Sequence, residues 1–327
     1  MRVGGHELPN RAFLAPMAGI TDAPMRRLAE RFGAGWVVSE MIASNALATG
    51  MGEMVRKLAT GAGRLPHVVQ LAGCEAQWMR RGAEIAAEAG AAIIDINMGC
   101  PAKRVTNGYA GSALMRVPDE ALRLIDAVVG ATPLPVTVKM RLGWDDDSLN
   151  AAALAKRAVD AGARMITVHA RTRQQFYKGE ARWHLVQPVV EAVDVPVVVN
   201  GDIVDAATAR EALRQSGAAA VMIGRGAQGQ PWIVGQIGAA LDGGVPDPAP
   251  EGEELAGLVA EHYEAMLNAY GTRVGVRVAR KHLDWYLAAT QAGVDCDARR
   301  SLLSSDDPVA VRRQIPALYG KTWREAA

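Results

Sequence analysis

Eight short apolar runs in this sequence each end in a residue that a buried strand does not need. In chain order these residues are Met17, Glu40, Gln70, Asn97, Lys139, His169, Asn200 and Gly224. A single one, such as Gln70 or His169, is explained as readily by a hydrogen bond within the core as by a function. Eight of them at equivalent positions indicate a shared site, where catalysis or cofactor binding needs such groups.

Lys139 is informative because an unpaired ammonium inside an apolar run is costly unless it meets an electron-rich partner. It suits two chemistries: a Schiff base, as in barrel aldolases, or stabilisation of negative charge on a reduced flavin. A flavin pyrimidine edge presents alternating donors and acceptors. Groups that could meet that edge are the side chain of Gln70 and the backbone of Pro16, Met17 and Ala18, which favours the flavin.

Two glycine-bearing loops follow the last two runs, Asn200-Gly201-Asp202 and Gly224-Arg225-Gly226. In barrels, the loops after strands seven and eight commonly hold a phosphate through backbone N–H groups. Arg225 adds a forked donor for phosphate oxygens. Either loop alone is explained by a glycine that ends a strand, but the two together predict a phosphate site.

Cys100 lies in a loop over residues 97–115 that is long enough to move as a lid. A thiol with an ordinary pKa of about 8.5 is mostly protonated at neutral pH and can donate a proton. Lys103 and Arg104 nearby would instead favour the thiolate and a nucleophilic role. Both roles stay open at this point. Cys74 and Cys296 are interpreted as small buried hydrophobic residues.

The apolar runs alternate with Ala-rich helical segments such as 78–90 and 149–162. The runs cover residues 11–17, 36–41, 67–73, 91–99, 135–141, 164–171, 196–202 and 220–226. Parallel strands buried on both faces have this continuous apolar character. Eight strand–helix units predict a TIM (β/α)8 barrel, in which the polar strand ends gather at the active-site face.

The pattern changes after residue 243, where a segment rich in proline and glutamate predicts a linker. Beyond it, the apolar spacing between Leu255 and Tyr270 predicts an amphipathic helix that stops at Gly271. A second helix is expected over about 273–290, and Asp307 with Pro308 predicts the start of a later one. We therefore expect a barrel domain over residues 1–243 and a small all-helical domain over residues 244–327.

Composition sets limits on the class of protein. The chain has 327 residues, with 36 Lys+Arg against 35 Asp+Glu, and 50% of the residues are hydrophobic, which excludes disorder and fibres. No run approaches 18 apolar residues, so we expect neither a membrane span nor secretion. Three widely spaced cysteines give no disulfide framework or metal knot, so we expect no metal and a cytoplasmic protein.

Eight segments form an ordered set across both predicted domains: LAPMAGITDAPMR (14–26), VVQLAG (68–73), DINMGCPAKRV (95–105), VKMRLGWD (138–145), VHARTRQQFYKG (168–179), VNGDI (199–203), IGRGAQGQPW (223–232) and ARKHLDWY (279–286). They resemble the tRNA-dihydrouridine synthases, most closely the bacterial DusB branch. The resemblance implies FMN at the barrel mouth, NADPH as reductant, and reduction of the C5–C6 bond of a D-loop uridine in tRNA to 5,6-dihydrouridine.

The resemblance also implies roles for individual residues. The flavin would lie against Pro16, Met17, Ala18, Gln70, Lys139 and His169, and its phosphate against Asn200, Gly201, Asp202, Gly224 and Arg225. Cys100 would protonate C5 while the flavin reduces C6, and Asn97 and Arg171 would approach the uracil. Reduction at C6 builds enolate charge on the ring, which a positioned acid can quench.

The uridine must leave its stack to reach a flavin, most cheaply from a loop that is already partly unpaired. On the second predicted helix of the tail, four basic residues stand at i, i+4, i+7 and i+8: Arg273, Arg277, Arg280 and Lys281. We call them the basic stripe. By itself such a stripe is an ordinary solvated face, but beside an RNA-modifying barrel it predicts contact with the tRNA backbone. We expect the protein to act as a monomer.

Three other functions compete with this one. An FMN barrel that reduces a small metabolite would not need the helical tail. A Schiff-base lyase would use Lys139 covalently and hold no flavin. A non-catalytic RNA-binding module would leave the polar strand ends unexplained.

Overall fold

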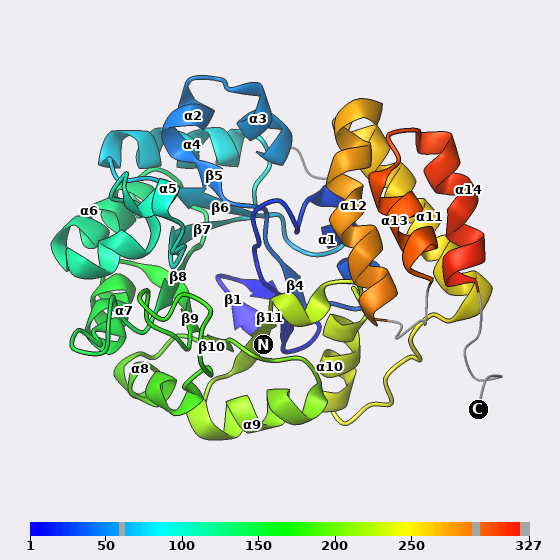
Figure 1. Ribbon diagram of the computed structural model, residues 1–327. Helices are drawn as coiled ribbons and strands as arrows, with labels where there is room; N and C mark the ends of the chain where they lie inside the picture. The colour runs from blue at the N-terminus through cyan, green and yellow to red at the C-terminus, as the bar shows by residue number, and fades with distance from the viewer. Residues whose placement is uncertain (59–62, 290–294, 321–327) are drawn as a thin grey trace.

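The computed structural model describes residues 1–58, 63–289 and 295–320, which form a barrel with a helical region at its side (Figure 1). The barrel strands are β3 (Ala12–Leu14), β4 (Trp36–Val37), β5 (Ile42–Ala43), β6 (Val68–Ala72), β7 (Ile93–Met98), β8 (Val136–Arg141), β9 (Ala163–His169), β10 (Val197–Asn200) and β11 (Ala220–Ile223). They pair in the order β4-β3-β11-β10-β9-β8-β7-β6-β5. A parallel bridge between Val38 and Val68 links β4 to β6 and closes the ring. The predicted TIM barrel is confirmed.

The second strand of the barrel is interrupted, although the sequence predicted one strand over residues 36–41. Two buried polar residues, Ser39 and Glu40, occupy the break between β4 and β5. The Ser39 hydroxyl accepts a hydrogen bond from the backbone N–H of Gln70 at 2.9 Å. The Glu40 carboxylate accepts one from the backbone N–H of Gly19 at 2.6 Å. Because these side chains satisfy backbone donors of neighbouring segments, the chain leaves the ladder here. Glu40 thereby supports the loop after β3.

Helices surround the barrel in Figure 1. They are α1 (Ala23–Arg31), α2 (Ser44–Ala48), α3 (Gly52–Leu58), α4 (Ala76–Glu88), α5 (Lys103–Thr106), α6 (Pro118–Val129), α7 (Ala151–Asp160), α8 (Gln187–Ala192), α9 (Ala206–Ser216) and α10 (Ile233–Leu241). The predicted helices over 78–90 and 149–162 are confirmed as α4 and α7. Local signals set their ends: Asp205 caps α9 by accepting from Thr208 N at 2.7 Å, and Gly217 ends it with φ +67. A short hairpin of β1 (Arg2–Val3) and β2 (His6–Glu7) precedes the barrel.

The inside of the barrel has an apolar end and a polar end. An apolar cluster fills the end near the strand starts, and it includes Phe13, Trp36, Val38, Val68, Ile93, Met165, Val198 and Met222. Side chains alternate along a strand, so residues two and four places beyond Ile93 point the same way as Ile93. Those residues are Asp95 and Asn97. The fold therefore carries polar side chains toward the carboxyl ends of the strands, above an apolar plug.

The carboxyl-terminal part of the chain contains α11 (Gly252–Tyr270), α12 (Thr272–Ala289), α13 (Cys296–Ser304) and α14 (Pro308–Tyr319). These helices share an apolar cluster that includes Val259, Tyr263, Leu283 and Ile315. The predicted end of the first helix and start of the last one are confirmed: Gly271 follows α11 with φ +74, and Asp307 caps α14 by accepting from Val309 N at 2.9 Å. Residues 290–294 and 321–327 of the predicted helical domain lie outside the described part. None of the described helices is long and apolar enough to cross a membrane.

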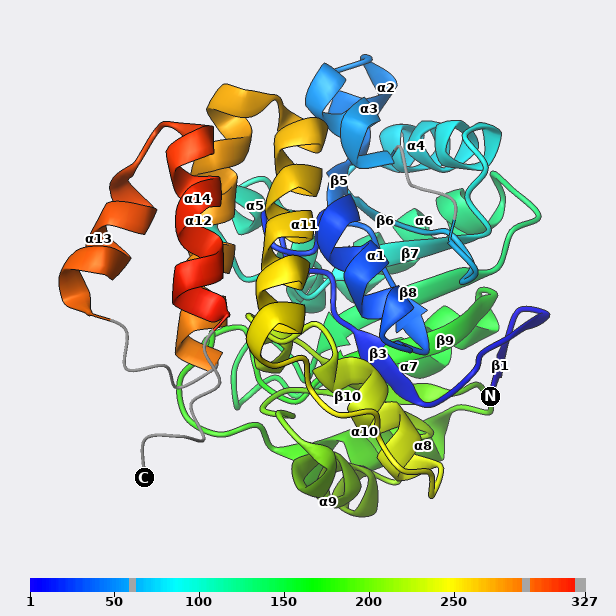
Figure 2. The ribbon, with the colours of Figure 1, turned by 90° about the vertical axis from the view of Figure 1, so that its right-hand side faces the viewer.

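The helical region is fastened to the barrel through α1 and α12. Figure 2 shows α11 lying along α1, where the Tyr270 hydroxyl donates to Asp22 at 3.0 Å. Asp22 also caps α1, so one carboxylate serves both elements. On α12, the backbone carbonyl of Trp285 lies so close to Gly229 that a Cβ built on that glycine would stand 2.1 Å from the oxygen. The approach is therefore backbone to backbone, and only glycine permits it.

Candidate active site

A cavity of about 600 Å³ opens at the carboxyl ends of the barrel strands, a size typical of small-molecule and cofactor sites. Seven of the eight strand-end residues line it, and Glu40, which supports the loop after β3, does not. The predicted cofactor, acid and uracil residues of the barrel all line it: Pro16, Met17, Ala18, Gln70, Asn97, Cys100, Lys139, His169, Arg171, Asn200, Gly201, Asp202, Gly224 and Arg225. The convergence of the strand ends, which are far apart in sequence, is thus observed. The basic stripe lies outside this lining, on α12.

The floor of the cavity carries a hydrogen-bonded relay that the sequence analysis missed. Thr137 Oγ1 donates to Asp95 Oδ1 at 2.6 Å, and Gln70 Nε2 donates to Asp95 Oδ2 at 2.7 Å. Asn97 Nδ2 donates in turn to Gln70 Oε1 at 2.8 Å, and Asn97 Oδ1 accepts from the backbone N–H of Cys100 at 3.0 Å. The relay therefore connects a buried carboxylate on β7 to the loop that carries the thiol. Its signal in the sequence was an aspartate inside the apolar run IIDI.

Lys139 is buried in the wall of the cavity and is held by a neutral partner. Its Nζ donates to Asn200 Oδ1 at 3.2 Å, while Asn200 Nδ2 donates to the Met222 carbonyl at 2.7 Å. Burial, together with the nearby Arg141 guanidinium, lowers the pKa of Lys139 from 10.5 to about 8. The same loss of water, with the cations Arg141 and Lys139, lowers the pKa of His169 well below its usual value. The wall thus offers a cation at Lys139 and a neutral imidazole at His169 near pH 7.

Glycines let both predicted phosphate loops pack closely against neighbouring segments. Gly201 has φ +126, and a Cβ there would lie 2.9 Å from the Ala181 Cβ and 3.2 Å from His169 Cδ2. A Cβ on Gly226 would lie 2.7 Å from the Ile203 carbonyl. A side chain at Gly201 would clash with Ala181, and one at Gly226 with the backbone that follows Asp202. Both loops line the cavity, so the glycines let their backbones close in on its edge.

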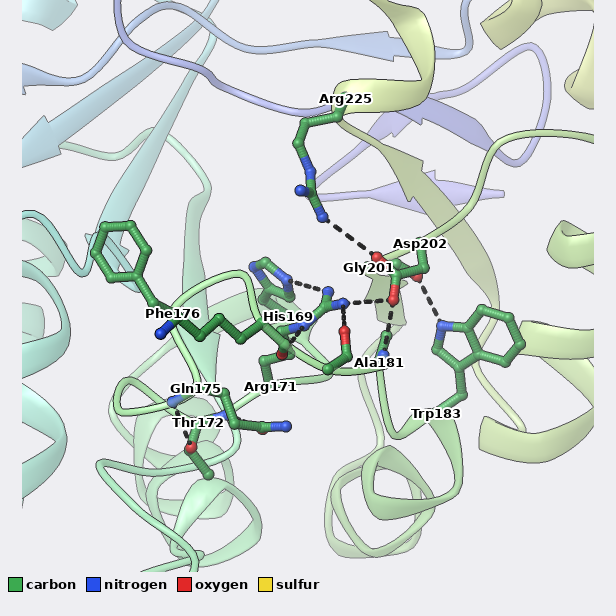
Figure 3. Close-up of polar contacts among 12 residues, drawn as sticks. His169, Arg171, Thr172, Gln175, Phe176, Ala181, Trp183, Gly201, Asp202 and Arg225 are labelled. Atoms are coloured by element: carbon green, nitrogen blue, oxygen red, sulfur yellow. Dashed lines mark hydrogen bonds and ion pairs between the residues drawn. The ribbon is translucent and has the colours of Figure 1, made fainter.

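An arginine–aspartate network braces the same edge of the cavity (Figure 3). The Arg171 guanidinium forms an ion pair with Asp202 and donates to the Gly179 carbonyl at 2.6 Å. Arg225 reaches Asp202 from the other side, with Nη2 at 3.4 Å from Oδ1. The Arg171 side chain is 2% exposed, against 54% for Arg225. Arg171 therefore organises the loop after β9. Arg225 remains more than half exposed, although its guanidinium also lies 5.2 Å from the centre of the Tyr177 ring.

Arg141 is a second residue that the sequence analysis missed. Its guanidinium donates to the carbonyls of Gly99 at 2.8 Å, Thr172 at 2.9 Å and Phe176 at 2.9 Å. It therefore joins the loop after β7, which carries the thiol, to the loop after β9. Its guanidinium carbon also lies 5.5 Å from the centre of the Tyr177 ring. A charged residue at the end of the run PVTVKMR was the signal for this role.

Cys100 is partly exposed in the cavity, and its loop is ordered by backbone contacts. The Cys100 carbonyl accepts from Ser112 N at 3.1 Å and from Ser112 Oγ at 2.9 Å. Between these residues the chain forms α5 and the start of a 3-10 helix, η1 (Gly111–Arg116). The interpretation of Cys74 and Cys296 as buried residues is wrong, because both are exposed. Only Cys100 among the three lines the cavity.

The basic stripe is confirmed as part of α12, but its members differ in their surroundings. Arg273 and Arg277 are exposed. Arg280 donates to the Asp306 carboxylate at 2.8 Å and to the Ser304 carbonyl at 3.2 Å, so it also ties α12 to the segment before α14. Lys281 points toward the barrel, since its Nζ would lie 3.3 Å from a Cβ built on Gly19. The stripe therefore runs from open surface to the loop after β3.

Comparison with known proteins identifies the family of the chain. The family model for dihydrouridine synthase (Dus) matches residues 13–307. A probable tRNA-dihydrouridine synthase of Rhodobacter capsulatus is 56% identical over 315 residues, which cover 96% of this chain and 95% of that protein. The tRNA-dihydrouridine synthase B of Pseudomonas putida is 45% identical over 324 residues, which cover 98% and 95%.

Solved structures with much lower sequence identity share the fold. Histamine dehydrogenase from Rhizobium sp. 4-9 aligns with a TM-score of 0.56 at 15% identity, covering 81% of this chain and 50% of that one. Morphinone reductase in complex with tetrahydroNAD aligns with a TM-score of 0.51 at 16% identity, covering 78% and 92%. Because the family model spans the barrel and most of the helical region, and the relatives match over nearly their whole length, the chain is an oxidoreductase that belongs to the dihydrouridine synthase family.

Proposed function

We propose that this protein uses FMN and NADPH to reduce the C5–C6 bond of a uridine in the D-loop of tRNA, giving 5,6-dihydrouridine. The observation that carries the proposal is the cavity that gathers Lys139, Gln70 and Cys100 from three different strands and loops. The names of the relatives from Rhodobacter capsulatus and Pseudomonas putida support tRNA as the substrate. We further propose that the protein works as a monomer in the cytoplasm and needs no metal.

The lining of the cavity fits FMN in its chemistry. Lys139 would stand against the pyrimidine side of the flavin, where its charge stabilises the reduced form. Gln70, His169 and the backbone of residues 16–18 supply donors and acceptors for the same ring. The backbone of Gly201 and Gly224 would approach the phosphate, with Asn200, Asp202 and Arg225 beside them. When bound, FMN supplies the hydride that the uracil receives.

Cys100 is proposed as the acid that delivers a proton to C5 of the uracil. The relay holds the backbone of Cys100 through its hydrogen bond to Asn97, so the Cα from which the thiol projects has a fixed position at the cavity. Asn97 and Arg171 are the residues that we expect to approach the uracil. Since the Arg171 guanidinium is already bonded to Asp202 and Gly179, we expect Arg171 to act mainly by holding the loop after β9.

We propose that residues 1–243 form the catalytic domain and residues 244–327 a tRNA-binding domain. Arg273, Arg277, Arg280 and Lys281 would contact the backbone of the tRNA along α12. The position of Lys281 beside the loop after β3 supports this contact surface, because an RNA strand that runs along α12 would reach the mouth of the barrel.

The proposal is tested by mapping dihydrouridine in tRNA from cells that lack this protein. One D-loop position should lose the modification, and the wild-type gene, but not a Cys100→Ala variant, should restore it. The purified protein should be yellow, with absorbance near 450 nm that NADPH bleaches. If every position keeps its dihydrouridine, and the colourless protein takes up no FMN, the Schiff-base chemistry of Lys139 becomes the better explanation.

A further inference from the structure

Every hydrogen bond between Cys100 and Asp95 in the relay at the cavity floor is donated in the direction of Asp95. The backbone N–H groups of Gly99 and Cys100 donate to Asn97 Oδ1, at 3.2 and 3.0 Å. Asn97 donates to Gln70, and Gln70 donates to Asp95. An ionised carboxylate only accepts hydrogen bonds. Asp95 is therefore the acceptor at which the whole series ends.

These hydrogen bonds fix which way the side-chain amides of Asn97 and Gln70 are turned. Two backbone donors fix the oxygen of Asn97, which turns its NH2 toward Gln70. The oxygen of Gln70 must then face Asn97, so the NH2 of Gln70 faces residue 95 and needs an acceptor there. A carboxylate meets that need with a charge-assisted bond, roughly twice as strong as a neutral one. Polarisation along a chain of hydrogen bonds extends the effect to the next link.

We propose that Asp95 is a positioning residue that locks Gln70 and Asn97 in the orientation that meets the flavin and the thiol loop. Asp95 lies on β7 and is not itself part of the cavity lining, so it acts through its hydrogen bond to Gln70, which is. The proposal rests on the proposed function in one respect, namely that FMN is the group that Gln70 contacts.

The charge of Asp95 gives this role a pH signature. The groups that face it are Gln70 on β6 and Thr137 and Lys139 on β8. Burial raises the pKa of Asp95 from 3.8 to about 6, against the lowering effects of its hydrogen bonds and of Lys139. The carboxylate is thus charged at pH 7.5 and becomes protonated below about pH 6. FMN affinity that depends on the charged form must fall as the pH drops through that value.

The test measures the Kd for FMN by fluorescence between pH 5 and pH 8, on the full-length wild type and the isosteric variant Asp95→Asn. The FMN phosphate also titrates near pH 6, but it does so in both proteins and cancels in the ratio of the two Kd values. Because the Asp95 charge also raises the pKa of Lys139, the same pair is measured with Lys139→Met in both proteins, where only the effect through Gln70 remains. We expect Asp95→Asn to bind about 10-fold more weakly at pH 7.5, the difference between a charged and a neutral hydrogen bond. The ratio should approach one at pH 5.

A second variant keeps the test decisive if Asp95→Asn fails to fold. Thr137→Val retains the carboxylate but removes a hydrogen bond that lowers the pKa of Asp95. FMN affinity in this variant should therefore start to fall at a higher pH than in the wild type. A Kd ratio that does not change with pH, whatever its size, or identical pH profiles for Thr137→Val and the wild type, would overturn the proposal. If the wild type itself does not bind FMN at pH 7.5, the proposed function fails instead.

Discussion

Replacing Lys139 by methionine should stabilise the flavin-free protein while it removes a group that the flavin needs. The ammonium is buried, 8% exposed, and its partner Asn200 is neutral. The fall in the pKa of Lys139 from 10.5 to about 8 corresponds to a cost on the order of 3 kcal/mol at neutral pH, because each tenfold change in proton affinity is worth about 1.4 kcal/mol. Methionine has a similar shape and no charge.

The sign follows from linkage between protonation and folding. A lysine whose pKa is lower in the folded state favours folding more as the pH rises, because the unfolded state binds the extra proton. The wild type should therefore gain on the order of 3 kcal/mol relative to Lys139→Met as the pH rises from 8 to 10.5. The lost hydrogen bond to Asn200 costs the variant about 1 kcal/mol at every pH. Lys139→Met should thus be about 2 kcal/mol more stable at pH 7 and lose that advantage near pH 10.

Urea denaturation of the two flavin-free proteins at pH 7 and pH 10 measures this difference. Groups distant from Lys139 titrate alike in both proteins and cancel in the comparison. Asp95 and His169, whose pKa values Lys139 lowers, titrate below pH 7 in the wild type, outside the range compared. A stability difference that stays constant between the two pH values would refute the reasoning, because it would mean that Lys139 carries no buried charge. A buried charge that lowers the stability of the protein but helps to bind a ligand is typical of functional sites.

Three further predictions concern the acid, the basic stripe and the junction. Cys100→Ala should keep FMN and tRNA binding but lose turnover by roughly 10²–10⁴-fold, as expected for a general acid; near-normal single-turnover rates would remove Cys100 from the mechanism. Arg277→Glu should weaken tRNA binding and reduce its salt slope by about 1 or more, without change in NADPH oxidation by the free enzyme, whereas the same change at Arg123 on α6 should do neither. Gly229→Ala should destabilise the protein by roughly 2 kcal/mol or more, since φ is +72 and the new methyl meets the Trp285 carbonyl. In a thermal melt Gly257→Ala, in open space on α11, should not destabilise.

The barrel could be predicted from the sequence because its strands are buried on both faces and leave continuous apolar runs. The break between β4 and β5 could not, since it depends on where Ser39 and Glu40 find partners in other segments. The residues at the strand ends were found for the same reason as the strands: the fold class fixes which end of each strand faces the cavity.

Residues that act through non-local contacts were missed or misplaced. Asp95 and Arg141 lie inside or at the end of apolar runs, and their roles depend on partners in distant loops. The basic stripe predicts that Arg280 contacts the tRNA backbone, but the sequence does not reveal its partner Asp306, 26 residues away. The exposure of Cys74 and Cys296 likewise depends on tertiary packing, which residue type alone does not determine.

The close approach of Gly229 to Trp285 has a consequence for how a substrate is chosen. Two backbones in contact leave no side chains that could yield, so the span between Arg277 and the cavity is set by the fold and does not adjust to the RNA. With the proposed contact between Arg277 and the tRNA, such an enzyme would select a nucleotide by its distance along the RNA from that contact, without recognition of the neighbouring bases. Substrates that differ in sequence but share one shape would then be modified alike.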